Sequence, residues 1–322
     1  MFRSSSTAHF VTTPFKQPNV VIQNPRNFLA HSKHIIVYNG LSPLVYETHD
    51  SLQLATFSIN NALKFVCEEH LFQCSIYLCR DENKDDWFAV SSSFDKSLLE
   101  STPPTSVLSN NFLRKLSLFN RKHFMIFGYS RSMINWQLKN QYCGACGSRT
   151  KILDAGHRIV CKKCSEESRG SAVLYPTITP TVLTLVVSKN TDFCILGRKP
   201  TFPPGYYSCL AGFVSPGESA ESSVIREIAE ETSLSIDPGS IIYEVSQSWP
   251  FTDGSQLALG FTVHSSFTNA ESLKCSDDEL EDVRWFSRKE VNLMLNNKHP
   301  QFRLPPKRSL SNYIIRKWAT EF

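Results

Sequence analysis

One predicted helix carries several carboxylates on one face, and this feature limits the folds that are open to the chain. Residues 219–232 have the spacing of an amphipathic helix, and at about 100° per residue three glutamates share one face. These are Glu227, Glu230 and Glu231. The opposite face, which we expect to meet a core, holds Ile225, Ile228 and Ala229. Carboxylates on neighbouring turns repel one another unless a cation lies among them, and such oxygen ligands suit Mg²⁺ or Mn²⁺. The helix therefore predicts a divalent-metal site that can engage phosphate oxygens.

The segment around this helix resembles the Nudix box, G-x5-E-x7-R-E-U-x-E-E-x-G-U, in which U is a bulky aliphatic residue. The matching positions are Gly212, Glu218, Arg226, Glu227, Ile228, Glu230, Glu231 and Leu234. Ser233 replaces the last glycine of the pattern. If that position needs a left-handed backbone, serine costs about 1 kcal/mol there but touches no metal ligand. The resemblance implies an α-β-α Nudix fold and a hydrolase.

The same resemblance implies roles for the matching residues. Glu227, Glu230 and Glu231 are implied to bind the catalytic Mg²⁺ or Mn²⁺, with Glu218 and Arg226 as supporting catalytic positions. The glycine of the box is implied to let the loop backbone approach the site. Nudix enzymes differ in which carboxylate acts as the general base, so that choice stays open.

Two Cys-x-x-Cys pairs precede the box. Their four thiols belong to Cys143, Cys146, Cys161 and Cys164. Two such pairs at ribbon spacing supply four thiolates to one tetrahedral Zn²⁺, which leaves no open position for water. We therefore expect a structural zinc ribbon. Contact with nucleic acid stays open because basic side chains surround the pairs, although a solvated basic face is the simpler interpretation.

Segments on both sides of the box resemble the NADH pyrophosphatase family. The ribbon stands directly before the catalytic domain, Ser246–Phe251 resembles the family's S-Q-P-W-P-F-P array, and Glu279 aligns with a further metal-binding glutamate. Ser248 and Thr252 replace prolines of the array. The implied substrate-binding residues are Phe213, Gln247, Trp249, Phe251 and Ser311. The aromatic ring after the box glycine either stacks on a substrate base or belongs to a core strand.

Length and charge bound the remaining possibilities. The chain of 322 residues suits two or three domains, and its net charge of +4 does not by itself imply nucleic-acid binding. No apolar run reaches about 18 residues, so we expect no membrane span. The six cysteines outside the pairs are interpreted as free thiols in a reducing compartment. The first acidic residue is Glu47, and this acid-free, hydroxyl-rich start predicts a mitochondrial transit peptide; a disordered tail on a cytoplasmic protein is the alternative.

We expect four parts: a tail or transit peptide at 1–30, a small α+β domain at 31–140, the zinc ribbon at 141–175 and a Nudix hydrolase domain at 176–322. Strands are predicted at 34–47 with a turn at Asn39-Gly40, at 181–188, 193–198 and 208–214. Further helices are predicted at 59–70, 122–139 and 308–320.

The resemblance implies hydrolysis of the pyrophosphate bond of NADH, and of NAD and related dinucleotides, to NMNH and AMP. Two alternatives stay open: removal of NAD caps from RNA, and a non-catalytic Nudix scaffold that binds nucleotides. Members of the family commonly form homodimers, which implies the same for this chain. The sequence leaves the preference among NADH, NAD, NADPH, ADP-ribose and capped RNA undecided.

Overall fold

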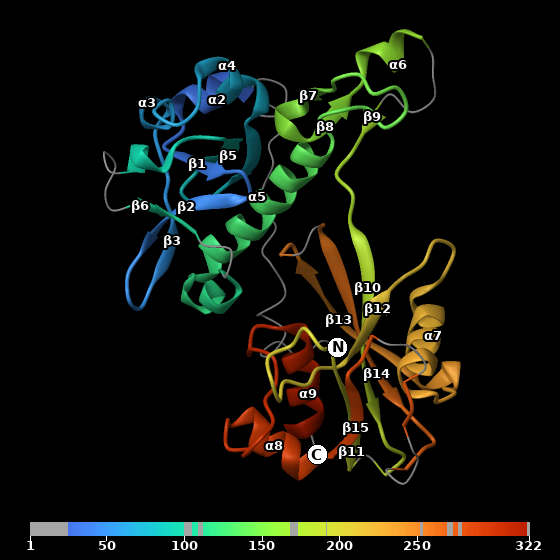
Figure 1. The fold of residues 1–322 in the computed structure, drawn as a ribbon. Helices are drawn as coiled ribbons and strands as arrows, with labels where there is room; N and C mark the ends of the chain where they lie inside the picture. Colours follow the sequence, from blue (N-terminus) through green and yellow to red (C-terminus); the bar gives the residue numbers. More distant parts are fainter. Residues whose placement is uncertain are drawn as a thin grey trace. The chain divides into compact units, whose positions relative to one another are not determined.

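The computed structural model describes residues 25–99, 105–108, 112–167, 173–190, 192–251, 254–268, 273–275 and 279–320. These residues divide into two compact units (Figure 1). The C-terminal unit contains Thr179–Trp249 and Gln256–Phe322, and the N-terminal unit contains Thr12–Ile178 and Pro250–Ser255. The expected transit peptide lies almost wholly outside the described residues, so the mitochondrial location stays a prediction.

The C-terminal unit is built on a mixed sheet. Its strands follow the order β13-β14-β10-β11-β15, and β12 pairs with β10. Only the β10–β14 pair is parallel among the pairs described. The strands are β10 (Thr179–Val187), β11 (Phe193–Arg198), β12 (Leu210–Phe213), β13 (Ile241–Trp249), β14 (Gln256–His264) and β15 (Asp282–Ser287). The three strands predicted in this region are confirmed within two residues at each end.

Helices cover both faces of this sheet because its central strand alternates between two cores. Leu185 and Val187 of β10 join the core under α8 (Arg288–Leu295) and α9 (Leu310–Thr320). Val182 and Val186 join the core under α7 (Ala220–Thr232). Successive strand residues point to opposite faces, so one apolar strand serves both helix layers. The expected α-β-α sandwich is confirmed, and Figure 1 shows α7 on one side of the sheet and α9 on the other.

Helix α7 buries a narrower stripe than the sequence indicated. Val224, Ile228 and Thr232 are fully buried, whereas Ala229 is exposed and Ile225 is half-buried. The expectation that Ala229 faces the core is wrong, because the helix packs along its i, i+4, i+8 row. The helix begins after Ser219, whose side chain accepts a hydrogen bond from the backbone N–H of Ser222.

The N-terminal unit contains a second mixed sheet. Its strand order is β3-β2-β1-β5-β4, with β6 paired to β2 and with β1 parallel to β5. The strands are β1 (His34–Asn39), β2 (Ser42–Glu47), β3 (Leu52–Leu54), β4 (Ile76–Arg80), β5 (Asp86–Ser92) and β6 (Thr105–Val107). The predicted turn is confirmed at Gly40, which has a φ of 59°.

The helices of this unit differ from expectation in one place. The helices are α2 (Pro25–His31), α3 (Ile59–Ala62), α4 (Glu68–Cys74) and α5 (Arg121–Lys139). The long helix predicted at 122–139 is confirmed as α5. The helix predicted at 59–70 is instead two short helices, because Cys67 takes an extended backbone (φ −66°, ψ 152°) between them. Phe65 and Val66, which precede it, have poor helix propensity and are buried.

The cysteine-rich segment forms a small sheet that docks on the same unit. Strands β7 (Lys151–Leu153), β8 (Arg158–Val160) and β9 (Val173–Leu174) pair in that order, and α6 (Lys162–Glu166) follows β8. His157 Nε2 lies 2.7 Å from the carbonyl oxygen of Tyr77. Gln137 Nε2 donates to the carbonyl oxygen of Gly156 at 3.2 Å. These contacts tie the segment to β4 and α5.

Four sulfur atoms converge at the end of this small sheet. The Sγ atoms of Cys143, Cys146, Cys161 and Cys164 all lie within 4.8 Å of one another. Two of the separations are 3.5 and 3.7 Å, close to the distance of about 3.8 Å between thiolates on one tetrahedral zinc. Hydrogen bonds from Ser148 lower the pKa of Cys146 to about 6, whereas the hydrogen bond with Cys146 raises the pKa of Cys164 to about 12. The four cysteines are therefore arranged as a structural zinc site.

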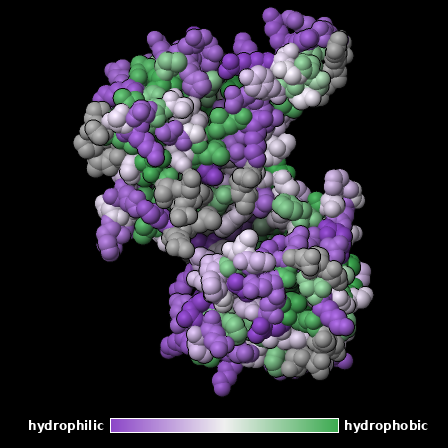
Figure 2. Space-filling view, viewed as in Figure 1, coloured by the Kyte–Doolittle hydropathy of each residue, from purple (hydrophilic) through white to green (hydrophobic). Residues whose placement is uncertain are grey.

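No helix in the described part of the chain is long and apolar enough to cross a membrane. On the face shown in Figure 2, hydrophilic and hydrophobic side chains are interspersed over both units.

We predict that the purified protein carries about one tightly held zinc ion per chain. Cys161→Ser should lose that zinc and lower the melting temperature by about 5 °C or more, since the short ribbon has little core besides its metal. Cys67→Ser is the matched control, because Cys67 is an exposed free thiol outside the cluster. Metal analysis that finds no zinc in folded, untreated protein would contradict the prediction.

Candidate active site

A single guanidinium group organises the acidic face of α7. Arg226 Nε and Nη2 donate to the two carboxylate oxygens of Glu218 at 2.7 and 2.9 Å. Its Nη1 donates to Glu227 Oε1 at 2.7 Å and to Glu230 Oε2 at 2.9 Å. The bidentate pair fixes the plane of the guanidinium, and the remaining donors hold two further carboxylates in place. Three like charges are thus held side by side by one cation.

The loop before α7 is anchored through the same arginine. Arg226 Nη2 also donates to the carbonyl oxygen of Phe213 at 2.8 Å, and Glu218 Oε2 accepts from the backbone N–H of Ser215 at 2.9 Å. The hydrogen bonds from Arg226 lower the pKa of Glu218 to about 2, so this carboxylate stays ionised at neutral pH. Both ends of the loop therefore meet at Arg226.

Gly212 leaves the room that the carboxylate of Glu227 occupies. A Cβ atom at Gly212 would lie 1.8 to 2.0 Å from the carboxylate atoms of Glu227. Burial raises the pKa of Glu227, Arg226 opposes that change, and the charges of Glu230 and Glu279 add to it. A divalent cation beside these groups would relieve the repulsion among them.

Glu231 and Glu279 are the other two glutamates that the sequence assigned to the metals. The side chain of Glu231 is only 1% exposed on α7. Glu279 precedes β15, lies near enough to raise the pKa of Glu227, and accepts a hydrogen bond from Lys199 Nζ at 2.8 Å. The structure places Glu227, Glu230 and Glu231 on α7, with Glu279 near Glu227, but within the described residues only the four cysteines bring three or more possible ligand atoms close enough together to hold one ion. Carboxylate oxygens are the ligands that Mg²⁺ and Mn²⁺ prefer, so the chemistry of these donors fits either ion, and binding at these glutamates stays a prediction.

Lys199 is a residue of this site that the sequence analysis missed. Burial lowers its pKa, but the hydrogen bond to Glu279 and the charges of Glu231 and Glu227 raise it overall. It follows β11 directly and belongs to no recognised motif. Only the pairing of β11 with β15 brings its strand end beside the segment that carries Glu279.

The residues expected to bind substrate lie in different surroundings. Phe213 is 54% exposed at the end of β12, which excludes the interpretation as a core residue. Trp249 is half-buried at the end of β13. Gln247, on the same strand, donates to the carbonyl oxygen of Arg308 and accepts from the backbone N–H of Leu310, both at 2.8 Å. Gln247 therefore fixes the start of α9.

Two other expected substrate contacts are buried. Ser311 is 3% exposed, and its hydroxyl accepts from the backbone N–H of Cys209 at 3.0 Å. Phe251 is 7% exposed and belongs to the N-terminal unit, where its ring packs against Phe124 and Phe127 of α5. These two side chains have packing roles in the structure, and their contact with substrate stays a prediction.

Ser233 has the left-handed backbone that the glycine of the box pattern implied. It ends α7 with φ 60° and ψ 19°, and its backbone N–H donates to the carbonyl oxygen of Ala229. Its hydroxyl donates to the carbonyl oxygen of Lys274 at 2.9 Å. This hydrogen bond offsets part of the cost of about 1 kcal/mol for a non-glycine residue in that conformation.

We predict that Gly212→Ala displaces the carboxylate of Glu227 and weakens Mn²⁺ binding by about tenfold or more, because an oriented ligand is lost. The melting temperature should fall only slightly, since the added methyl group displaces a side-chain carboxylate held by Arg226 and no backbone atom. Titration of Mn²⁺ by electron paramagnetic resonance measures the affinity. Gly239→Ala is the control, because a Cβ there has its nearest neighbour, Asp237 Oδ2, at an ordinary 3.4 Å. Equal Mn²⁺ affinities in both variants would contradict the prediction.

Comparisons with known proteins agree with this geometry. Residues 177–306 match the NUDIX domain, and residues 138–168 match the NADH pyrophosphatase zinc ribbon domain. The chain is 33% identical over 274 residues to the human protein named NAD(P)H pyrophosphatase NUDT13, mitochondrial, covering 80% of this chain and 74% of that one.

Two further relatives are named NAD-capped RNA hydrolases. Human NUDT12 is 33% identical over 196 residues, which cover 60% of this chain and 41% of that protein. NudC of Pseudomonas fluorescens (strain Pf0-1) is 34% identical over 192 residues, which cover 60% of each chain. The chain thus spans less than half the length of NUDT12 but about three quarters of NUDT13. By its box, its ribbon and this likeness, the chain belongs to the Nudix hydrolase family, among the members that carry an NADH pyrophosphatase zinc ribbon.

Proposed function

We propose that this protein hydrolyses the pyrophosphate bond of NADH, and of NAD and related dinucleotides, to a nicotinamide mononucleotide and AMP. The observation that carries the proposal is the acidic cluster formed by α7 and the loop before it, in which Arg226 holds Glu218, Glu227 and Glu230. Such a cluster is suited to cations that bridge phosphate oxygens. The name of the human relative, NAD(P)H pyrophosphatase, supports the choice of substrate class.

Each part of the site has a proposed task. Glu227, Glu230, Glu231 and Glu279 would hold Mg²⁺ or Mn²⁺, which when bound polarises a phosphoryl group and lowers the pKa of a water nucleophile. Arg226 keeps the carboxylates in register, so that little rearrangement is needed when the charge on the phosphates develops. The exposed ring of Phe213 is placed beside the anchored loop, where it can stack on a substrate base.

Removal of NAD caps from RNA is the second candidate. Two relatives are named NAD-capped RNA hydrolases, and an NAD cap contains the same pyrophosphate bond as free NAD. The chemistry at the carboxylates would be identical, and only the size of the leaving nucleotide would differ. The complete set of carboxylates argues against a scaffold without activity.

Product chromatography separates these candidates. The full chain is incubated with Mg²⁺ or Mn²⁺ and with NADH, NAD, ADP-ribose or NAD-capped RNA in parallel. AMP and a mononucleotide from NADH support the proposal, whereas turnover of capped RNA alone supports the second candidate. A chain that cleaves none of the four with either metal is a scaffold.

Glu231→Gln tests the chemistry of the site. Loss of this buried charge should lower kcat by about 10² or more, on the order of 3 kcal/mol, as for comparable electrostatic deletions. Glu221→Gln is the matched control, because Glu221 is an exposed carboxylate in the first turn of the same helix. A Glu231→Gln chain that hydrolyses NADH at the wild-type rate with saturating Mg²⁺ rules out the metal-site interpretation.

Trp249→Ala tests recognition separately from chemistry. It should mainly raise KM or change the ranking of NADH against ADP-ribose, with metal dependence unchanged. The melting temperature must be measured alongside, because truncation of a large aromatic residue can destabilise the unit. Ile242→Ala, at an exposed position of the same strand, is the control. A fall in kcat alone, with KM and the ranking unchanged, would contradict a recognition role.

A further inference from the structure

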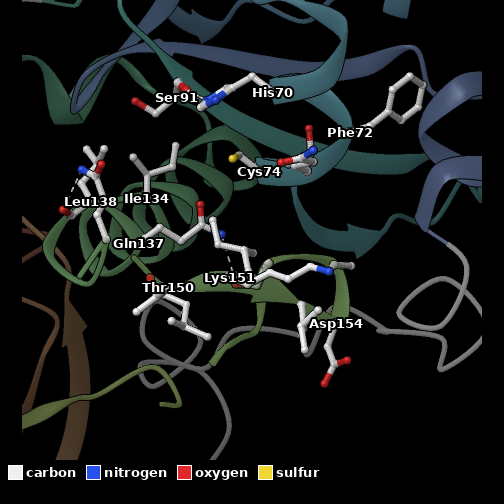
Figure 3. A pocket seen from close by; sticks show the side chains of 18 of the residues that line it. His70, Phe72, Cys74, Ser91, Ile134, Gln137, Leu138, Thr150, Lys151 and Asp154 are labelled. Carbon is white, nitrogen blue, oxygen red and sulfur yellow. Dashed lines mark hydrogen bonds between the residues drawn. The ribbon is translucent and has the colours of Figure 1, made fainter. Parts of the chain in front are cut away.

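A cavity of about 660 Å³ lies within the N-terminal unit, whereas the acidic helix belongs to the C-terminal unit. It is lined by α4, by the C-terminal half of α5 and by the ribbon strand β7 (Figure 3). Its volume lies within the range of about 300 to 1,000 Å³ that is usual for small-molecule sites. None of its lining residues belongs to the proposed active site.

One part of the cavity wall is apolar and carries a fixed amide. Ile134 and Leu138 of α5 and Ile152 of β7 line it. Gln137, on the same helix, is held by the hydrogen bond from its Nε2 to the carbonyl oxygen of Gly156. A glutamine amide has two N–H donors and one acceptor oxygen, so within the described part of the chain a second N–H and the oxygen remain for a ligand. Figure 3 shows this side chain between α5 and the ribbon strand.

A second part of the wall is positively charged. Arg149 and Lys151 are exposed at the rim, on either side of Thr150. Within the described residues, no ion pair is recorded for either cation. The nearby carboxylate of Asp154 is instead paired with Arg158, at 2.7 and 3.2 Å. The two rim cations are therefore available to an anion.

Two further side chains of the lining are those of Cys74 and Ser75. Cys74 and Arg149 both line the cavity; burial raises the pKa of the Cys74 thiol, and the charge of Arg149 opposes this. Ser75, also in the lining, is 7% exposed, and its buried hydroxyl has no hydrogen-bond partner among the described residues. Buried polar groups are normally satisfied, so a hydroxyl in this state calls for a partner such as a ligand or an ordered water.

We propose that this cavity is a second binding site, for a nucleoside monophosphate with an adenine-type base. The base lies against the apolar wall, where the free N–H and oxygen of Gln137 match the N7 and N6 edge of adenine. The phosphate, which is close to a dianion at neutral pH, meets Arg149 and Lys151. The site does not depend on the proposed catalytic function, because its residues lie in the other unit.

Alkylation of Cys74 reports occupancy of this cavity directly. The zinc-loaded full chain is treated with iodoacetamide, and the rate at each cysteine is followed by mass spectrometry. With AMP at about ten times its Kd, alkylation of Cys74 should slow about tenfold, because only the unoccupied fraction reacts. Cys67 is the internal control, because it caps the same helix, is exposed and does not line the cavity.

Three ligands separate the base from the phosphate. AMP should protect Cys74, adenosine should protect it more weakly, and inorganic phosphate at the same concentration should not. Equal protection by adenosine and AMP overturns the role of the cations, and equal protection by phosphate and AMP overturns the role of the base. Protection of Cys67 to the same extent, or none at Cys74 with millimolar AMP, overturns the site itself.

A pair of double variants supplies the matched control. Arg149→Gln with Lys151→Gln should abolish protection of Cys74 by AMP, whereas Lys162→Gln with Lys163→Gln, on the exposed face of α6, should preserve it. Glu231→Gln should also preserve it, since that residue lies in the other unit. Calorimetric titration of AMP is the second readout, and the first double variant should bind one AMP fewer per chain. Identical calorimetric stoichiometry in both double variants overturns the proposal.

Discussion

The guanidinium of Arg226 is the contact on which the acidic site depends. It holds Glu218 through both carboxylate oxygens and reaches Glu227 and Glu230 with a third nitrogen. Carboxylates packed this closely would otherwise repel one another, and one fixed cation keeps them in place without filling the whole site. Because the same guanidinium also binds the carbonyl oxygen of Phe213, it ties the helix to the loop that precedes it.

The sandwich around α7 sets the depth of each carboxylate. Val224 and Ile228 anchor the helix on the sheet, which buries Glu231 and leaves Glu230 nearer to solvent. Gly212, on the adjacent strand, leaves space for Glu227 alone. A buried charge is costly unless a partner compensates it, so the depth of each carboxylate decides how much it would gain from a bound cation. The four cysteines of the N-terminal unit have a different role. A zinc ion bound by them would cross-link a segment that has little hydrophobic core of its own.

The two sets of candidate site residues could be predicted from spacing along the chain. The acidic face of α7 follows from the helical repeat, and the four-cysteine cluster follows from two short pairs, because both depend on local geometry. The α-β-α arrangement was implied by the family resemblance. The glycine of the box pattern raised the question of a left-handed backbone at Ser233, and the structure has that conformation there. Local prediction failed where packing overrides propensity, as at Cys67, where one expected helix is two.

Spacing along the chain identifies the residues that carry the acidic and thiol chemistry, whereas contacts between distant segments set the surroundings of those residues. Lys199 reaches Glu279 only because β11 pairs with β15, a contact between residues far apart in the chain. Long-range contacts also set the surroundings of Ser311 and Phe251. The hydroxyl of Ser311 accepts a hydrogen bond from the backbone of Cys209, and the ring of Phe251 packs in the other unit. Periodicity records which face of an element is apolar, but not which partner covers it. Only long-range packing selects that partner, and so fixes burial, exposure and charge at each site.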